Sequence, residues 1–161
     1  MKSVSALGPD GLRALMEPES AGSDESGRGG GGGGGQRPLL VVDCRAFTSF
    51  NAGHVVGAVN VHCPPIVRRR AGGLIPAVNV LRSAEAVADV AAGRCRAVVL
   101  YDERSDAGVD ALSAESDARL SLSSLAAVVA ASTPLYFLTG IVARPRPVIY
   151  HADIVKCGVR V

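Results

Sequence analysis

Four short runs of apolar residues constrain the fold of this chain more than any other feature. The first, Leu39–Asp43, reads LLVVD and ends in a carboxylate; the others are AVNV at 58–61, AVVLY at 97–101 and LYFL at 135–138. None shows the polar alternation of a strand with one face in water, so each run is typical of a strand buried on both faces. The sequence therefore predicts four buried strands.

Segments of helical period lie between these runs. Residues 83–92 place Val87 and Val90 on one face and meet a stop at Gly93, and residues 116–131 carry a cluster of apolar side chains before Pro134. Alternation of buried strands with crossover helices predicts an α/β fold, a mainly parallel sheet flanked by helices. Ligands meet such sheets at the carboxyl ends of the strands, so functional residues are expected directly after each run.

Composition divides the chain into four parts. The 161 residues leave room for one compact domain of about 100 to 120 residues. We predict an N-terminal segment at 1–19 with a short helix over 10–16, a disordered glycine-rich insert at 20–38, one folded domain at 39–140 and a divergent tail at 141–161.

Charge and cysteine content exclude several classes of protein. The net charge of +2 argues against a general nucleic-acid binder. No run of about 18 apolar residues and no secretory signal occur, so we expect no membrane span and a location in the nucleus or cytoplasm. Cys44, Cys63, Cys95 and Cys157 lack paired short spacings and are expected to be free thiols. We expect no metal and no cofactor.

The loop after Tyr101 is the first place to look for a nucleophile. It reads Asp102, Glu103, Arg104, Ser105 and contains no cysteine. Phosphate or sulfur transfer in such a loop needs a thiolate aimed into backbone N–H groups, whereas two carboxylates repel an anionic ligand. We favour a structural loop in which the arginine pairs with a neighbouring acid.

A literal match to the tyrosine-phosphatase signature is present in His62, Cys63 and, after five residues, Arg69. The loop after such a cysteine must donate successive backbone N–H groups to phosphate oxygens, and Pro64 and Pro65 have none. We therefore favour an ordinary loop and keep residual chemistry at this cysteine as an alternative.

A compact basic cluster follows at residues 66–73. Ile66 and Val67 precede Arg68, Arg69 and Arg70, and two glycines close the segment. Guanidinium groups can fork onto carboxylates while the apolar pair fills a groove, which suits an acidic docking surface. Composition leaves two other interpretations open, a solvated basic loop and a nuclear-import signal.

Two further residues receive structural interpretations. No nucleophile with a partner acid is arranged around His54, so we expect a hydrogen-bonded histidine in the turn before the second strand. Asp43, at the end of the first strand, is expected to cap the turn or to pair with Arg45 or nearby loop residues.

The residues taken in order resemble a known family. The stretch LLVVDCRAFTSFNAGHVVGAVNVHCPPIVRRRAGG resembles the start of the rhodanese-like domain of dual-specificity MAP kinase phosphatases, in particular the inducible nuclear members. AVVLYDERS and LYFLTG continue the likeness to Gly140, so that it covers about 100 of 161 residues.

This resemblance implies a fold, a partner and a lost activity. It implies a rhodanese-like sheet flanked by helices, with Asp102 at the position of the nucleophilic cysteine of active rhodaneses. It further implies that residues 66–70 form a kinase-docking motif for the acidic groove of a MAP kinase. The chain would then take part in negative regulation of MAP kinase signalling without phosphatase activity of its own.

The chain departs from the family after Gly140. Family members continue into a closing helix, a linker and a catalytic domain, whereas this chain continues with alternating Arg and Pro. We expect a truncated or alternatively spliced product, or a gene model read into an intron, with the last helix missing or replaced and modest stability as the result. The alternative function is a fragment of an enzyme with protein tyrosine/serine/threonine phosphatase activity toward MAP kinases.

Overall fold

The structure is a computed structural model that describes residues 2–17, 37–61, 65–70, 75–103, 109–113 and 116–140. The predicted glycine-rich insert falls almost wholly outside these ranges, and the predicted tail falls entirely outside them. Within α3 the side chains of Pro65, Val67 and Arg68 are also not described.

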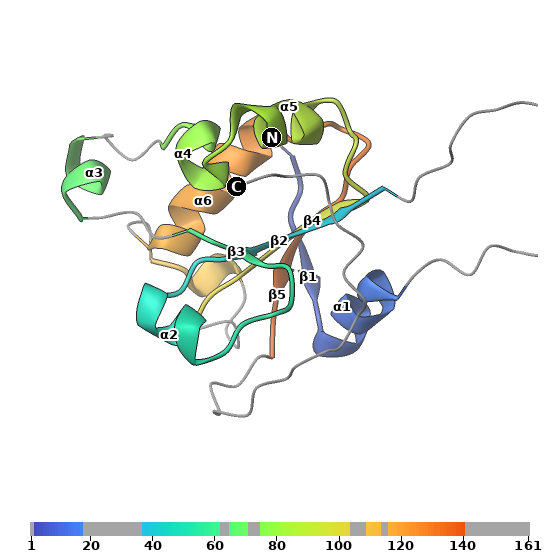
Figure 1. Cartoon of the computed structure of the whole chain (residues 1–161), viewed down its shortest axis with the longest axis horizontal. Helices are drawn as coiled ribbons and strands as arrows, with labels where there is room; N and C mark the ends of the chain where they lie inside the picture. Colours follow the sequence, from blue (N-terminus) through green and yellow to red (C-terminus); the bar gives the residue numbers. More distant parts are fainter. Residues whose placement is uncertain are drawn as a thin grey trace, which may run out of the picture.

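The centre of the fold is a parallel sheet of five strands in the order β1-β5-β4-β2-β3 (Figure 1). The strands are β1 (Ser5–Leu7), β2 (Leu39–Asp43), β3 (Val59–Asn60), β4 (Ala97–Tyr101) and β5 (Leu135–Leu138). The predicted α/β class is confirmed, and all four apolar runs contain a strand, although β3 is shorter than its run.

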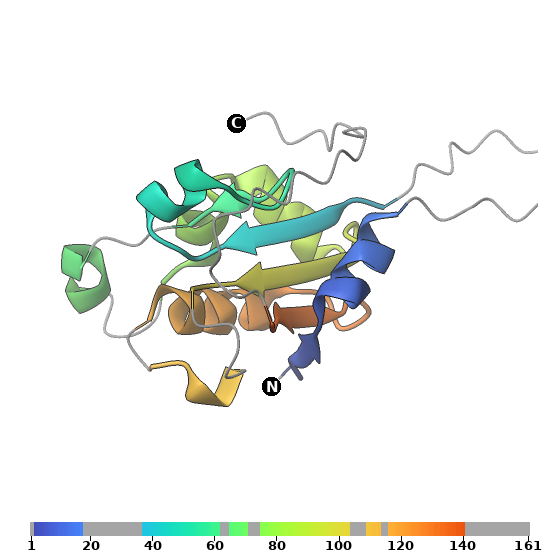
Figure 2. The ribbon, with the colours of Figure 1, turned by 90° about the horizontal axis from the view of Figure 1, so that it is seen from below.

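Helices cover both faces of the sheet, as Figures 1 and 2 show. They are α1 (Pro9–Met16), α2 (Phe47–Ala52), α3 (Pro65–Arg70), α4 (Ala77–Leu81), α5 (Ala84–Ala91) and α6 (Asp117–Val128), with a short 3-10 helix η2 (Val109–Ala111). In Figure 1, α4, α5 and α6 lie on one side of the sheet and α1 on the other.

The central strand β4 explains why its sequence has no polar alternation. All five of its residues are buried, and it pairs with β2 on one side and β5 on the other. Val98 and Leu100 pack into the core beneath α4, α5 and α6, whereas Val99 and Tyr101 pack into the core on the side of α1. Because both faces are covered, every position requires an apolar side chain.

The two cores differ in size. The core under α4, α5 and α6 includes Phe137, Leu125 and Val90, each with at most 1% of its surface exposed. The core under α1 is smaller and is closed by Leu12, with Leu15 and Met16 packed against it. These three residues form the apolar face that the sequence predicts for this helix. Burial of apolar area on the larger side supplies most of the hydrophobic stabilisation.

Serine side chains begin the two long crossover helices where the sequence predicts. The hydroxyl of Ser83 accepts a hydrogen bond from Ala86 N at 3.2 Å, and that of Ser116 accepts one from Arg119 N at 3.1 Å. Each bond satisfies an N–H that the first helical turn leaves without a partner. After α5, Gly93 adopts a φ of +70°, the conformation that favours glycine at a helix end.

Several elements were not predicted from the sequence, among them β1, α2 and α4. β1 has two exposed residues out of three and therefore carries no apolar run, but it pairs in parallel with β5 and adds an edge to the sheet. α2 buries none of its residues, and α4 has only five residues. Segments so short or so exposed have no periodicity that a sequence can display.

The arginine cluster lies on a helix, which corrects the expectation of a loop. Pro65 occupies the first position of α3, where its fixed φ suits a helix and its missing N–H costs nothing. In a helix successive residues turn by about 100°, so the three adjacent arginines cannot all face one way. Ile66, Arg69 and Arg70 share a face instead, because they are three and four residues apart.

Candidate functional site

The carboxylate of Asp43 organises the carboxyl edge of the sheet. Its Oδ1 accepts hydrogen bonds from Arg45 N at 2.9 Å and Nε at 3.0 Å, and its Oδ2 accepts one from Arg45 Nη2 at 2.7 Å. Tyr101 donates its hydroxyl proton to the same Oδ2 at 2.6 Å. The predicted pairing of Asp43 with Arg45 is thereby confirmed.

This network connects neighbouring elements. The hydroxyl oxygen of Tyr101 accepts a hydrogen bond from Val55 N at 3.2 Å, and Arg45 Nη2 donates to the carbonyl of Gly53, at the end of α2, at 2.6 Å. Asn60 Nδ2 donates to the carbonyls of Asp43 and Arg45 at 3.1 and 3.0 Å. The ends of β2, β3, β4 and α2 are therefore held by one set of polar contacts.

Burial and pairing fix the protonation states of this network. The hydrogen bond to Asp43 raises the pKa of the Arg45 guanidinium, so this group stays charged. Burial raises the pKa of the Tyr101 phenol, and the neighbouring Asp43 raises it further, so the hydroxyl stays protonated and can donate. The guanidinium also lies over the phenol ring, 5.2 Å from its centroid, a favourable cation–π contact.

A cleft of about 180 Å³ opens beside this network. Its walls come from the residues after β2, the residues after β4, η2 and the start of α6; they are Cys44, Arg45, Ala46, Asp102, Glu103, Leu112, Ser113, Ser116, Asp117 and Ala118. The guanidinium in this wall is already engaged with Asp43, whereas three of the lining side chains are carboxylic acids. The cleft is therefore poorly suited to phosphate or another anion.

Cys44 brings a thiol to this cleft, which the sequence reading did not anticipate. The residue has 5% of its surface exposed, and burial raises the pKa of the thiol, with Asp43, Asp102 and Asp117 raising it further. The side chain of Ser121 opposes this shift through a hydrogen bond. The thiol is therefore held in its neutral, weakly nucleophilic form. Its place directly after the first predicted strand was the signal that could have identified it.

The loop after β4 is only partly described. Asp102 has 8% of its surface exposed, and Glu103 is exposed and accepts a hydrogen bond from the hydroxyl of Ser49 on α2. Arg104 and Ser105 lie outside the described residues, so the predicted pairing of the arginine with an acid stays a prediction. The first two residues place carboxylates at the carboxyl end of the central strand.

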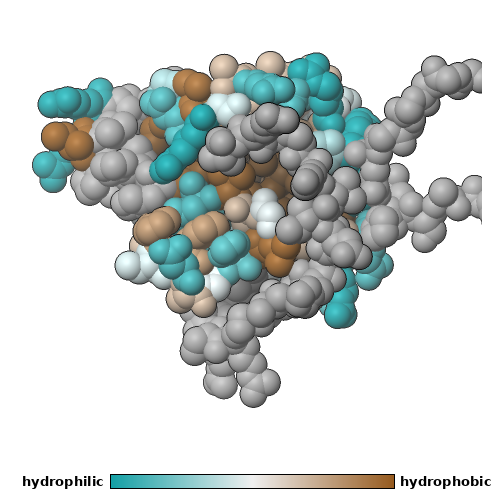
Figure 3. Space-filling model, viewed as in Figure 1, coloured by the Kyte–Doolittle hydropathy of each residue, from teal (hydrophilic) through white to brown (hydrophobic). Residues whose placement is uncertain are grey.

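The predicted docking residues lie apart from the cleft, on α3. This helix stands out from the body of the molecule at one end in both ribbon views (Figures 1 and 2). Ile66 is 58% exposed, and Arg69 and Arg70 are exposed as well. The space-filling view shows hydrophilic and hydrophobic side chains together on this helix at the left edge (Figure 3).

Two other candidates have separate outcomes. His54 is exposed, its Nδ1 lies 2.9 Å from the carbonyl oxygen of Phe50, and its ring stacks on the ring of Phe50 at 3.8 Å. The predicted hydrogen-bonded histidine is confirmed. His62 and Cys63 of the phosphatase-like signature lie outside the described residues.

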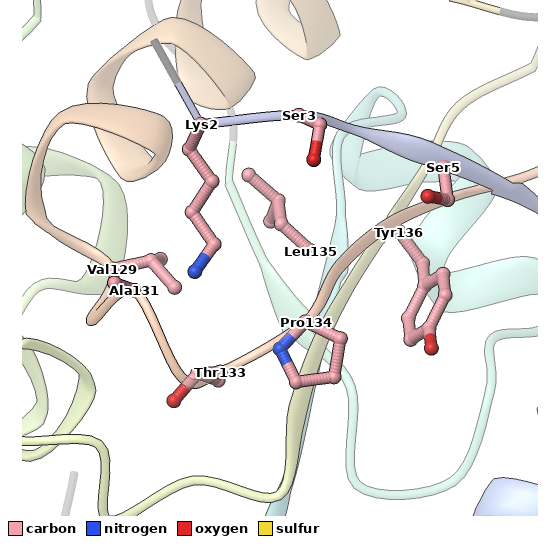
Figure 4. A pocket seen from close by; sticks show the side chains of 9 residues that line it. All are labelled: Lys2, Ser3, Ser5, Val129, Ala131, Thr133, Pro134, Leu135 and Tyr136. Atoms are coloured by element: carbon pink, nitrogen blue, oxygen red, sulfur yellow. The ribbon is translucent and has the colours of Figure 1, made fainter.

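A second hollow of about 490 Å³ lies at the opposite end of the sheet (Figure 4). It is bounded by the first residues of the chain and by the turn that leads into β5, and Lys2 Nζ donates a hydrogen bond to the carbonyl of Ala130 within it. Since the strands are parallel, this is the amino end of β5, where α/β sheets do not usually bind ligands.

The described ranges contain no group of three or more His, Cys, Asp or Glu side chains placed to hold a metal ion. In the same ranges, every helix is too short or too polar to cross a membrane.

Comparison with known families agrees with this geometry. Residues 33–137, more than half of the chain, match the rhodanese-like domain. The chain therefore belongs to the rhodanese-like domain family.

Curated proteins that are similar to this chain include dual specificity protein phosphatases. The chain is 39% identical over 138 residues to dual specificity protein phosphatase 1 of Rattus norvegicus, which covers 85% of this chain and 32% of that protein. It is 40% identical over 104 residues to dual specificity protein phosphatase 1 of Homo sapiens, and this match covers 65% of this chain and 24% of that protein. It is 42% identical over 104 residues to dual specificity protein phosphatase 4 of Gallus gallus, and this match covers 62% of this chain and 25% of that protein. The chain thus spans about a third or less of the length of these relatives.

Removal of the Asp43 carboxylate tests its role in stability. We expect Asp43→Ala to lower the free energy of unfolding by about 3 kcal/mol, because the partly buried guanidinium and the buried phenol would lose their shared acceptor. The matched control is Asp89→Ala, which breaks the exposed pair with Arg94 and should cost under about 1 kcal/mol. Urea unfolding followed by circular dichroism measures both. Equal losses in the two variants would contradict a special role for Asp43.

The thiol of Cys44 predicts a dependence of stability on pH. Its folded pKa is raised above the ordinary value of 9.0, so its contribution is fully present below pH 9.0 and is lost as pH rises above that value. We expect the free energy of unfolding to fall as the pH rises from about 9 to about 10. This thiol contributes up to about 1.4 kcal/mol per pH unit to that decline. Cys44→Ala should show a shallower decline in urea unfolding at several pH values. Parallel curves for the two proteins would contradict the assignment.

Proposed function

We propose that this chain is a docking module for MAP kinases, of the kind found in dual-specificity protein phosphatases, and that it acts in negative regulation of MAP kinase signalling. The observation that carries the proposal is the exposure of Ile66, Arg69 and Arg70 on one face of α3. The likeness to dual specificity protein phosphatases 1 and 4 supplies the class of partner. A nuclear or cytoplasmic location belongs to the same proposal.

The geometry of α3 supports a contact with an acidic groove. A short helix that stands out from the body can enter a groove on a partner without a clash from the sheet (Figure 2). Planar guanidinium groups of Arg69 and Arg70 suit paired carboxylates, and Ile66 on the same face can fill an adjoining apolar pocket. Arg68 lies on the same helix, turned by about 100° from Arg69 and outside the face that carries Ile66.

The charge balance makes the contact local. With a net charge of +2 the whole molecule exerts little long-range attraction, so binding depends on the arginines of α3. A contact of this kind weakens as salt rises, because added ions screen exposed charges over about 10 Å at 0.1 M.

We also propose that the described cleft is catalytically silent. The position after β4 carries Asp102 and Glu103, and Cys44 in the same cleft is held as a neutral thiol. Sulfur or phosphoryl transfer needs a thiolate and a favourable field for an anion. This cleft instead holds a neutral thiol and carboxylic acids. The chain would therefore sequester a kinase or compete for it.

Loss of the arginines tests the docking proposal. We expect Arg68→Ala/Arg69→Ala/Arg70→Ala to abolish pull-down of a MAP kinase and Arg69→Ala/Arg70→Ala to weaken binding by at least about tenfold, because the charge-assisted contacts are lost. Arg68→Ala alone should have the smaller effect. Biolayer interferometry at two salt concentrations gives the dissociation constants, and circular dichroism checks that the fold is kept.

A matched control separates local contact from overall charge. Arg13→Ala/Arg119→Ala also removes two positive charges, but from exposed positions on α1 and α6. We expect this variant to bind as the unaltered chain does. Unchanged binding in the triple arginine variant, or equal weakening in the control, would remove α3 from the docking model.

Activity assays test the proposed silence of the cleft. We expect the purified chain to release no phosphate from phosphotyrosine peptides and no thiocyanate from thiosulfate and cyanide. Turnover of a phosphotyrosine peptide that disappears in Cys63→Ser would overturn the proposal and favour the phosphatase alternative.

A further inference from the structure

Phe47, the first residue of α2, is the most exposed large hydrophobic side chain in the part of the chain that the structure describes. Its exposed fraction is 61%, against 58% for Ile66 on α3 and 43% for Val78 on α4. A single exposed apolar residue needs no explanation, because much of any protein surface is apolar. The way in which α2 is held, and its position in the molecule, do need an explanation.

α2 is held by polar contacts and not by a buried face. None of its residues is buried. The hydroxyl of Ser49 donates to Glu103, the carbonyl of Gly53 accepts from Arg45 at 2.6 Å, and Phe50 both stacks on His54 and offers it a carbonyl. These contacts fix the helix in place while the ring of Phe47 faces solvent. A side chain presented from a fixed element loses less entropy on binding than one on a mobile loop.

α2 and α3 lie at the same end of the molecule. In both ribbon views the two helices lie toward the left of the molecule, with α2 just after the carboxyl end of β2 (Figures 1 and 2). The two most exposed large hydrophobic side chains therefore belong to the end that also carries the exposed Arg69 and Arg70. α4, which carries Val78, packs against α5 and α6 and lies at the upper left in Figure 1.

Positive and negative side chains occupy different places at this end of the molecule. Arg69 and Arg70 make α3 basic, whereas the exposed Glu103 lies beside α2 through its bond with Ser49. An acidic partner surface is attracted to α3 and repelled at Glu103, so over α2 the partner must present apolar or uncharged groups. The ring of Phe47 is the apolar group that meets them.

We propose that Phe47 is a second anchor of the docking surface, at the same end of the molecule as α3, and that the partner is an acidic kinase groove bordered by an apolar pocket for this ring. The inference rests on the proposed docking function and extends it from one helix to two. Buried aromatic anchors contribute much of the binding energy at protein interfaces, and the polarity from α3 to Glu103 would fix the orientation of the bound partner.

Substitution at Phe47 tests this anchor. We expect Phe47→Ala to weaken binding of a purified MAP kinase by about tenfold in biolayer interferometry and Phe47→Leu to keep most of the affinity. The dependence of affinity on salt should stay unchanged in both, because no charge is removed, whereas Arg69→Ala/Arg70→Ala should reduce it. Val78→Ala, at the exposed apolar position on α4, is the comparison variant and should have the smaller effect, because Val78 is less exposed than Phe47.

Hydrogen exchange gives a second readout that requires no substitution. In the complex, the amides of both α2 and α3 should exchange more slowly than in the free chain. Normal affinity of Phe47→Ala, together with protection of α3 alone, would overturn the second anchor and leave the arginine contact standing. Failure of the unaltered chain to bind any MAP kinase would instead remove the docking function and, with it, this extension.

Discussion

The arrangement of this molecule depends on one buried carboxylate. Asp43 closes β2 with none of its surface exposed, and it accepts hydrogen bonds from Arg45 and from the Tyr101 hydroxyl at the end of β4. A buried charge without partners would be strongly destabilising, so the guanidinium and the phenol are required wherever this carboxylate stays ionised. Through Gly53 the same guanidinium holds the end of α2. The edge where an α/β sheet ordinarily binds ligands is therefore occupied by internal pairing.

This pairing bears on the proposed function. The guanidinium that faces the cleft is engaged with Asp43, and the cleft keeps carboxylic acids and a neutral thiol, Cys44. Such a site repels anions and offers no ready nucleophile. The exposed arginines lie elsewhere, on α3. In this proposal the rhodanese-like scaffold serves as a rigid support, and its surface helices make the contacts with the partner.

Much of the framework could be predicted from the sequence, because its signals are local. The buried strands β2, β4 and β5 appear as apolar runs, and the caps Ser83 and Ser116 begin their helices at the expected positions. The pairing of Asp43 with Arg45 could also be predicted, since the two residues are separated only by Cys44. β1 and α2 could not be, because β1 is formed by pairing with a distant strand and α2 is held by contacts with Glu103 and Arg45. The interpretation of the arginine cluster as a loop was wrong because a helix of six residues is too short to display a period in the sequence, and Pro65 is compatible with its first position.

The sequence by itself determined the α/β class, the buried strands and the carboxylates Asp102 and Glu103 directly after the strand at 97–101, because each follows from which residue types stand next to one another. Only the tertiary structure decided that Cys44 shares a cleft with Asp102 and Asp117 and that Ile66 shares a face with Arg69 and Arg70. It also decided that α2, whose first residue is Phe47, lies at the same end of the molecule as α3 (Figures 1 and 2). Such relations depend on distance in space and on the turn of a helix, which the order of residues encodes only through the completed fold.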